Sequence, residues 1–186
     1  MTEYLYELRI PRDRIAVLIG KEGSVKKDIE SETKTKIDID SKEGDISISG
    51  EDALGLYSCR EVIRAIGRGF NPEIAKLLIK PDYCFEFIDL KEYVGKSKDH
   101  LLRVKGRVIG SEGKTRRLIE ELTESYVCVY GKTIGIIGLT DLATIAREAV
   151  ERLLSGSPHS KVYTFLEKKR RDIKRARLVG GDLKLG

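Results

Sequence analysis

Hydrophobic and polar positions follow the same succession of patterns twice along the chain. Residues 4–10 alternate apolar and polar side chains, and residues 83–88 form a second strand-like run, so both predict strands. A short helical pattern follows each run, over about 12–18 and 98–108. Each of these helices ends at two glycines separated by two residues, where another helical pattern begins.

The two copies align at an offset of 90 residues. Residues 19–30 and 109–120 share an Ile, both glycines, a Glu inside the loop, a second Ile and the Glu that follows it. The basic pair at 26–27 coincides with another at 116–117. Self-similarity in both pattern and loop residues indicates a duplicated structural unit.

Each copy continues with two strand-like runs joined by a short glycine-containing turn, which predicts a hairpin, and then with a closing helix. The predicted fold class is therefore α+β, with two β-α-α-β-β-α units, each a three-stranded antiparallel sheet packed against three helices. We expect the first unit at residues 1–70 and the second at 81–156. Residues 71–80 would form an inter-domain helix or linker, and 157–186 a basic C-terminal extension and tail.

The glycine loops indicate what such a unit could bind. Glycine permits positive φ and lets another backbone approach without a Cβ clash. Because each loop leads into a helix, the unpaired N–H groups and the helix dipole favour an anion there. Both loops also contain a glutamate, Glu22 or Glu112, whose carboxylate would repel a phosphate unless it points outward. The pattern predicts a small phosphate-binding turn.

The element order and the loops resemble type I KH domains, in which a GxxG loop binds the backbone of about four nucleotides of single-stranded RNA. Residues 65–73 and 156–163 are also similar to the Pno/Dim and Krr-type KH proteins of small-subunit ribosome assembly. This resemblance implies an archaeal or eukaryotic protein that binds the 3′ region of small-subunit rRNA in ribosome assembly, pre-rRNA processing or translation. It further implies a translation initiation factor or a ribosome-assembly nuclease as a partner.

Positive charge is concentrated around the second loop. The whole chain has a net charge of +5, yet residues 96–117 alone carry +6, whereas the equivalent window 6–27 carries +3. We therefore expect the second unit to supply most of the specific RNA affinity. The candidate RNA-binding residues are the two loops and their surroundings, including the aliphatic groove that the resemblance implies: Gly20, Lys21, Glu22, Gly23, Lys105, Arg107, Val108, Ile109, Gly110, Ser111, Glu112, Gly113, Lys114, Arg117 and Cys128.

Enzyme classes find little support in the residues. Gly131-Lys132-Thr133 is similar to the end of a P-loop, but Tyr126 stands where that motif needs a glycine. The two histidines have no partnered cysteine or acidic motif. We expect no enzyme activity, no catalytic residue, no cofactor and no metal site. A protein–protein adaptor with degenerate KH units stays open as an alternative.

The cysteines and the hydropathy suggest a compartment. Three cysteines without a CxxC spacing argue against a zinc site or a disulfide framework and favour a reducing, cytoplasmic environment. No apolar run reaches the roughly 18 residues that a membrane span needs, so no membrane association is expected. We expect a monomer.

The basic C-terminal segment allows two interpretations. Residues 161–177 carry a net charge of +6, whereas residues 1–160 carry −1. The segment would be either a helix that contacts RNA or an acidic protein surface, or a loose tail that adds only nonspecific attraction. Val162, Phe165 and Leu166 favour a docked helix. We expect truncation after Ser155 to leave both units folded and to weaken RNA binding.

Overall fold

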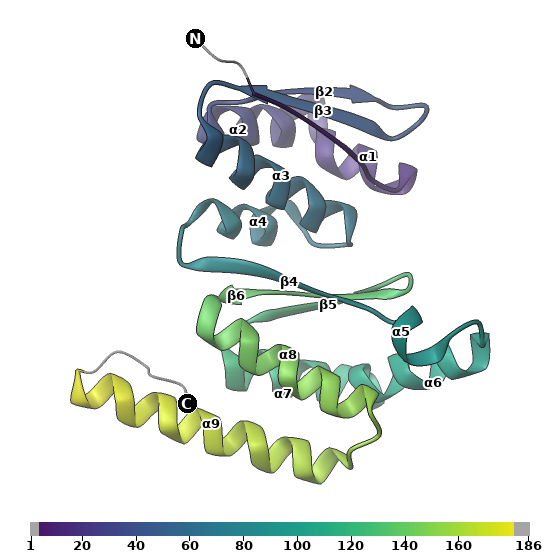
Figure 1. The fold of residues 1–186 in the computed structure, drawn as a ribbon, viewed down its shortest axis with the longest axis vertical. Coiled ribbons are helices and arrows are strands. Elements are labelled where there is room, and N and C mark those ends of the chain that lie inside the picture. Colours follow the sequence, from purple (N-terminus) through teal and green to yellow (C-terminus); the bar gives the residue numbers. More distant parts are fainter. Residues whose placement is uncertain (1–3, 181–186) are drawn as a thin grey trace. The chain divides into compact units, whose positions relative to one another are not determined.

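The computed structural model describes residues 4–180 and forms two compact units that divide between Phe85 and Glu86. Each unit has one three-stranded antiparallel sheet with its helices on one face (Figure 1). Residues 1–3, at the start of the first predicted unit, and 181–186, in the predicted tail, lie outside the described range. Among residues 4–180, no helix combines the length and the apolar character needed to cross a bilayer.

The first unit begins with a strand and ends with two short helices. Its elements are β1 (Tyr4–Arg9), α1 (Arg12–Ile19), the 3-10 turn η1 (Lys21–Gly23), α2 (Ser24–Thr33), β2 (Lys36–Asp40), β3 (Asp45–Gly50), α3 (Ala53–Gly67), α4 (Pro72–Ala75) and η2 (Lys76–Ile79). The strand order in the sheet is β1-β3-β2. Ile37, Ile46 and Ile48 point into the core and are buried, whereas Asp38 and Asp45 face outward, so the alternation in the sequence sets the face of each strand.

The second unit repeats this plan and adds a long final helix. Its elements are β4 (Tyr83–Asp89), α5 (Lys91–Val94), α6 (Lys98–Ile109), η3 (Ser111–Gly113), α7 (Lys114–Thr123), β5 (Tyr126–Tyr130), β6 (Thr133–Leu139), α8 (Thr140–Leu154) and α9 (His159–Val179). The sheet order, β4-β6-β5, matches that of the first unit. The predicted α+β fold class and the β-α-α-β-β-α order of both units are confirmed.

Residues 71–80 form the two short helices α4 and η2. Asn71 caps α4 by accepting a hydrogen bond from the Glu73 N–H at 3.0 Å. Ala75 and Leu78 are buried, and η2 packs against α3. This segment is therefore held by the first unit. The precise domain limits stay predictions.

The repeat in the sequence extends to backbone geometry and hydrogen bonds. The four non-glycine residues with positive φ form two pairs at the same offset, Glu22 with Glu112 and Lys34 with Glu124. In each unit a glutamate of the loop helix accepts the first core N–H of the next strand: the N–H of Ile37 lies 2.7 Å from Glu30, and that of Val127 lies 2.8 Å from Glu120. Both units therefore attach the loop helix to the sheet through the same side chain.

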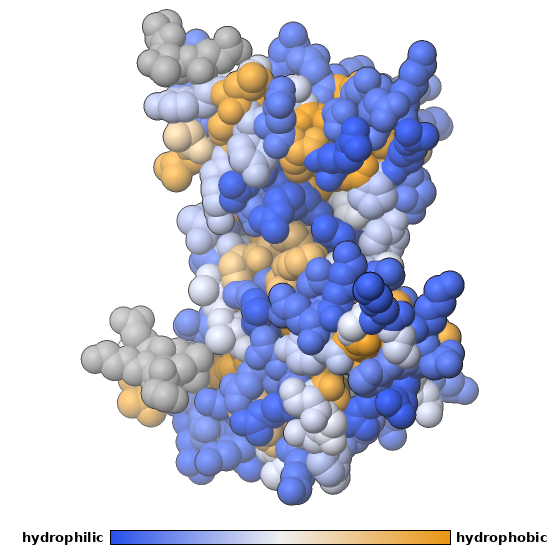
Figure 2. All heavy atoms as spheres, turned by 45° about the vertical axis from the view of Figure 1, so that its right-hand side comes forward, coloured by the Kyte–Doolittle hydropathy of each residue, from blue (hydrophilic) through white to orange (hydrophobic). Residues whose placement is uncertain are grey.

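The surface is mainly hydrophilic on the face shown in Figure 2, where hydrophobic residues lie in separate patches. The most exposed large hydrophobic side chains in the described range include Leu54, Leu102 and Leu178. Scattered exposed side chains of this kind are normal for a folded protein.

The basic C-terminal segment is a packed helix of the second unit. Val162, Leu166 and Ile173 of α9 are fully buried, and α9 packs against α7 and α8. The Glu124 carboxylate, at the C-terminal end of α7, accepts hydrogen bonds from both Arg170 and Arg177 of α9. The docked interpretation of the segment is the one that the packing supports. The expectation that the second unit folds without it must be revised.

Removal of every residue after Ser155 should destabilise the second unit by several kcal/mol. The deletion exposes the surface under the three buried α9 side chains, and each such side chain contributes about 1.5–3 kcal/mol. Urea unfolding monitored by circular dichroism measures the change. A chain truncated after Gly180 is the control and should unfold like the full-length protein. Equal stability of the two truncated proteins would show that α9 does not stabilise the unit.

Glu124→Gln should weaken the attachment of α9 in a pH-dependent way. The hydrogen bond from Arg177, supported by Arg170, lowers the pKa of the Glu124 carboxyl from 4.5 to about 2. The stabilisation is therefore complete above the unfolded pKa and is lost as the pH falls through the folded pKa. We expect a loss of about 1 kcal/mol or less at pH 7, because Glu124 is 37% exposed and solvent screens the pair.

Thermal unfolding of Glu124→Gln and of the parent protein between pH 3 and pH 7 tests this difference. Glu121→Gln, on the same helix and exposed, is the control for loss of one negative charge. A deficit that stays constant down to pH 3 would contradict an electrostatic origin.

Candidate nucleic-acid interface

The two GxxG loops have the same conformation. Gly20 and Gly110 have φ of +72° and +73°, and Gly23 and Gly113 have +76° and +75°. A Cβ on Gly110 would lie 2.2 Å from the Thr115 Oγ1, and a Cβ on Gly20 would lie 2.5 Å from the Val25 Cγ2. The first glycine is therefore required by close packing as well as by φ. At Gly113 no atom lies within 4 Å of an added Cβ, so there only the positive φ favours glycine.

The helices that follow the loops start without a side-chain cap. Neither α2, after Gly23, nor α7, after Gly113, has a side chain that accepts a hydrogen bond from its first N–H groups. In contrast, Asp52 caps α3 and Ser97 caps α6. The first backbone N–H groups of α2 and α7 therefore lack the side-chain acceptor that usually covers a helix start, which suits an anion supplied from outside.

The glutamates inside the loops adopt left-handed conformation, with φ of 54° at Glu22 and 52° at Glu112, and both are exposed. A basic side chain braces each loop through the backbone carbonyl of that glutamate. Arg117 donates to the Glu112 carbonyl at 2.9 Å, and Lys27 reaches the Glu22 carbonyl at 3.4 Å. The shorter contact makes the second loop the better braced of the two.

The basic candidates of the second unit lie on different sides of the loop. Lys114 is exposed on the first turn of α7. Lys105 donates to the Gly131 carbonyl at 2.9 Å and so connects α6 to the β5–β6 turn. Arg107 points the other way and donates to the carbonyls of Leu153 at 2.9 Å and Ser157 at 2.5 Å. The guanidinium of Arg107 therefore holds the end of α8.

The apolar candidates separate by burial. Val108 is fully buried in the core under the loop, so its side chain supports the loop and has no surface to offer a ligand. Ile109, at the end of α6, and Cys128, on β5, are half-buried and keep accessible surface. The remaining loop candidates, Lys21 and Ser111, are exposed.

The strands that follow the loop helices differ in charge between the units. In the first unit Asp38 and Asp40 are exposed on β2, whereas Cys128 and Tyr130 occupy the equivalent positions of β5. Carboxylates repel a phosphate backbone. The second unit therefore presents the more favourable surface for RNA.

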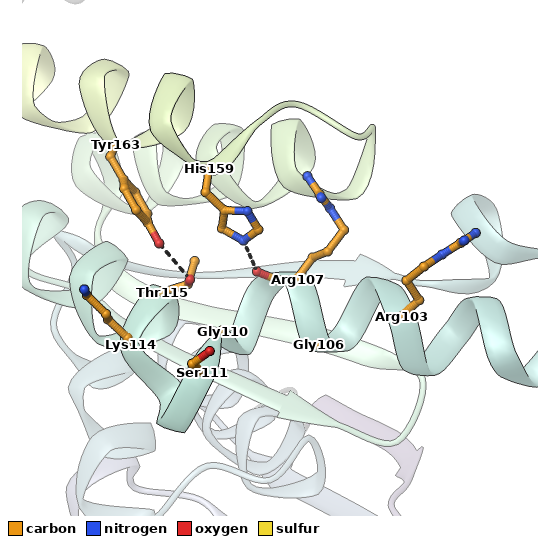
Figure 3. A pocket seen from close by; sticks show the side chains of 9 residues that line it. All are labelled: Arg103, Gly106, Arg107, Gly110, Ser111, Lys114, Thr115, His159 and Tyr163. Carbon is orange, nitrogen blue, oxygen red and sulfur yellow. Dashed lines mark hydrogen bonds between the residues drawn. The ribbon is translucent and has the colours of Figure 1, made fainter.

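Sequence reasoning missed the residues that α9 brings to the second loop. His159 Nε2 lies 2.9 Å from the Arg107 carbonyl oxygen, and the Tyr163 hydroxyl lies 2.8 Å from the Thr115 hydroxyl. Figure 3 shows both rings reaching from α9 toward α6 and the start of α7. Together with the loop they enclose a cavity of about 450 Å³, the α9 pocket, lined by Arg103, Gly106, Arg107, Gly110, Ser111, Lys114, Thr115, His159 and Tyr163.

The described residues contain no group of three or more His, Cys, Asp or Glu side chains placed to bind a metal ion. The three cysteines, all within that range, are free thiols. Burial raises the pKa of the Cys59 thiol above its usual value, so this cysteine is a neutral core residue.

Substitution of the two glycines of the second loop should have unequal effects on stability. Gly110→Ala should cost more than about 2 kcal/mol, because its Cβ overlaps Thr115 in addition to the unfavourable φ. Gly113→Ala has space and should cost about 1 kcal/mol from φ alone. Chemical denaturation of both variants measures the difference. Equal costs would show that the contact with Thr115 does not constrain the loop.

Two family models match the chain. Residues 84–171 match the model described as eukaryotic type KH-domain (KH-domain type I), and residues 5–65 match the model of the KH domain. The first of these matches runs through α8 into α9.

Curated relatives cover most or part of the chain. The chain is 51% identical over 174 residues to a KH domain-containing protein of Methanocaldococcus jannaschii, which is 91% of this chain and 76% of the relative. It is 27% identical over 169 residues to the RNA-binding protein pno1 of Dictyostelium discoideum, 88% of this chain and 71% of the relative. It is 34% identical over 113 residues to the pre-rRNA-processing protein PNO1 of Yarrowia lipolytica, 60% of this chain and 44% of the relative.

Solved structures have the same fold. Dim2p from Pyrococcus horikoshii is 46% identical with a TM-score of 0.83, and the match covers 89% of this chain and 99% of that chain. A crystal structure of the a/eIF2alpha-aDim2p-rRNA complex from the same organism matches at 45% identity with a TM-score of 0.85, over 91% of this chain and 96% of that chain.

Proposed function

This chain belongs to the PNO1/Dim2 family of KH-domain proteins, and we propose that it binds single-stranded RNA of the small ribosomal subunit through the GxxG loop of its second unit. The observation that carries the proposal is the start of α7. An uncapped helix N-terminus follows a glycine loop, and Lys114 and Arg117 lie on its first turns. This arrangement supplies backbone N–H groups and two cations to a phosphate.

The RNA-contacting surface that we propose is narrower than the set predicted from the sequence. It comprises the loop Gly110–Ser111–Glu112–Gly113, with Lys114 and Arg117, and the half-buried Ile109 and Cys128 beside it. Lys105 contributes charge next to the β5–β6 turn. Val108 and Arg107 support this surface from behind, because one is in the core and the other binds carbonyls.

The first loop, with Gly20, Lys21, Glu22 and Gly23, contributes less to RNA binding in this proposal. It has the same backbone, but the nearby strand carries Asp38 and Asp40, and the sequence window around the loop has half the net charge of the second. Electrostatic attraction to phosphate is therefore weaker there.

The relatives indicate the process and the partners. Proteins named PNO1 are RNA-binding and pre-rRNA-processing proteins, and aDim2p of Pyrococcus horikoshii has been crystallised with rRNA and a/eIF2alpha. We extend this to the present chain, as a non-enzymatic protein that binds the 3′ region of small-subunit rRNA in ribosome assembly, with an initiation factor as partner. A cytoplasmic location belongs to the same proposal, and the free thiols are compatible with it.

A matched pair of variants tests the ranking of the two loops. Lys27 and Arg117 lie at the same position of the repeat, and each donates to the carbonyl of its loop glutamate. Arg117→Gln should weaken binding to single-stranded rRNA fragments clearly more than Lys27→Gln. It should also reduce the slope of log affinity against log salt by about 0.7, the value of one lost phosphate contact.

Binding titrations at several salt concentrations, with circular dichroism to verify folding, provide the measurement. A larger loss in Lys27→Gln would reverse the ranking of the units. RNA affinity that neither variant changes would favour the alternative of a protein–protein adaptor.

A further inference from the structure

We propose that the α9 pocket binds a phosphate group of the same RNA strand, next to the nucleotides that the GxxG loop holds. This inference rests on the proposed function and adds a binding site to it. The pocket shares Gly110, Ser111 and Lys114 with the loop, and its other wall comes from α9. A strand that leaves the loop on this side would therefore place its next phosphate in the pocket.

The pocket has the charge that a phosphate requires. Its lining contains Arg103, Arg107 and Lys114 and no carboxylate. Arg107 uses its guanidinium on the carbonyls of Leu153 and Ser157. Within residues 4–180, Arg103 and Lys114 make no hydrogen bond or ion pair, and both are exposed. Two cations are thus free to bind an anion from opposite ends of the pocket, as Figure 3 shows.

The α9 wall adds hydrogen-bonding groups that are held in place. A carbonyl oxygen can only accept, so His159 must donate its Nε2–H to the Arg107 carbonyl, which fixes the orientation of the ring. Of the hydroxyls of Thr115 and Tyr163, one donates to the other, and the hydroxyl that accepts keeps its own proton for a ligand. The Ser111 hydroxyl, which is exposed, provides another donor at the loop side.

The shape of the pocket depends on glycine. Gly106 and Gly110 form its floor on α6, and no atom lies within 4 Å of a Cβ built on Gly106. The volume of about 450 Å³ has room for a phosphate with its sugar. A glycine in the interior of an exposed helix costs about 1 kcal/mol relative to alanine. An open floor accounts for its use at position 106.

The first unit has no equivalent of this pocket. At the matched positions, Asp13 replaces Arg103, Ser24 replaces Lys114 and Val25 replaces Thr115. The helix that follows α3 is α4, which has four residues, whereas α9 has 21. Both the cations and the covering helix are therefore specific to the second unit, whose loop is otherwise the same as the first.

RNA length separates the pocket from the loop in a binding experiment. The probes are random-sequence pools of single-stranded RNA 4-mers, which a GxxG loop accommodates, and of 8-mers, which extend beyond it. Gly106→Glu places a carboxylate in the pocket and improves helix propensity. It should weaken 8-mer binding about tenfold, the effect of losing one charged contact, and leave 4-mer binding within about twofold. Arg103→Gln should lower the 8-mer salt slope by about 0.7.

Matched variants control for charge and for folding. Ala16→Glu makes the equivalent change in the first unit, and Lys98→Gln removes one exposed cation of α6 outside the pocket. Both should bind the 8-mers more tightly than Gly106→Glu does. All variants should unfold at or above the parent temperature, and Gly106→Ala should be more stable than the parent.

The outcomes distinguish the pocket from the loop. Parent-like 8-mer binding by Gly106→Glu and Arg103→Gln, or equal losses for 4-mers and 8-mers, would overturn the pocket and leave RNA binding by the loop intact. A parent protein that binds neither pool would overturn both proposals. Pools with a 5′-hydroxyl and with a 5′-phosphate identify the source of the phosphate: equal sensitivity indicates an internal phosphate, and sensitivity confined to the phosphorylated pool indicates a terminal one.

Discussion

The close packing of the first loop glycine against the helix that follows it determines the geometry of both units. Only a residue without a Cβ leaves space for Val25 beside Gly20 and for Thr115 beside Gly110. This contact fixes the turn between two helices, and the turn leaves the second helix without a side-chain cap. The steric constraint and the capacity to bind an anion are thus two results of the same backbone arrangement.

A common scaffold lets the differences between the units be assigned to single positions. The loop dihedrals, the left-handed residues and the glutamate that joins helix to strand recur at an offset of 90 residues. What differs is the charge beside the loop and the presence of α9. Since the backbone is repeated, a difference in RNA affinity between the units must come from side chains and from α9.

Helix α9 combines a structural and a functional role. Its buried side chains and the bonds from Arg170 and Arg177 to Glu124 hold it against α7. The same docking brings His159 and Tyr163 to the second loop. Glu124 has a left-handed backbone at the end of α7, and its counterpart in the first unit is Lys34, which has no such helix to bind. One position of the repeat has therefore acquired the ion pair that attaches the additional element.

The sequence by itself determined the strands, the helices, the two loops and their order, because alternation, helical periodicity and paired glycines are local signals that the repeat states twice. It also located the charge around the second loop. Only the tertiary structure decided that Arg107 binds the end of α8, that Val108 is enclosed in the core, and that His159 and Tyr163 face the loop. These contacts join residues 46 to 52 positions apart, and no local pattern encodes which distant partner a side chain meets once the helices have packed.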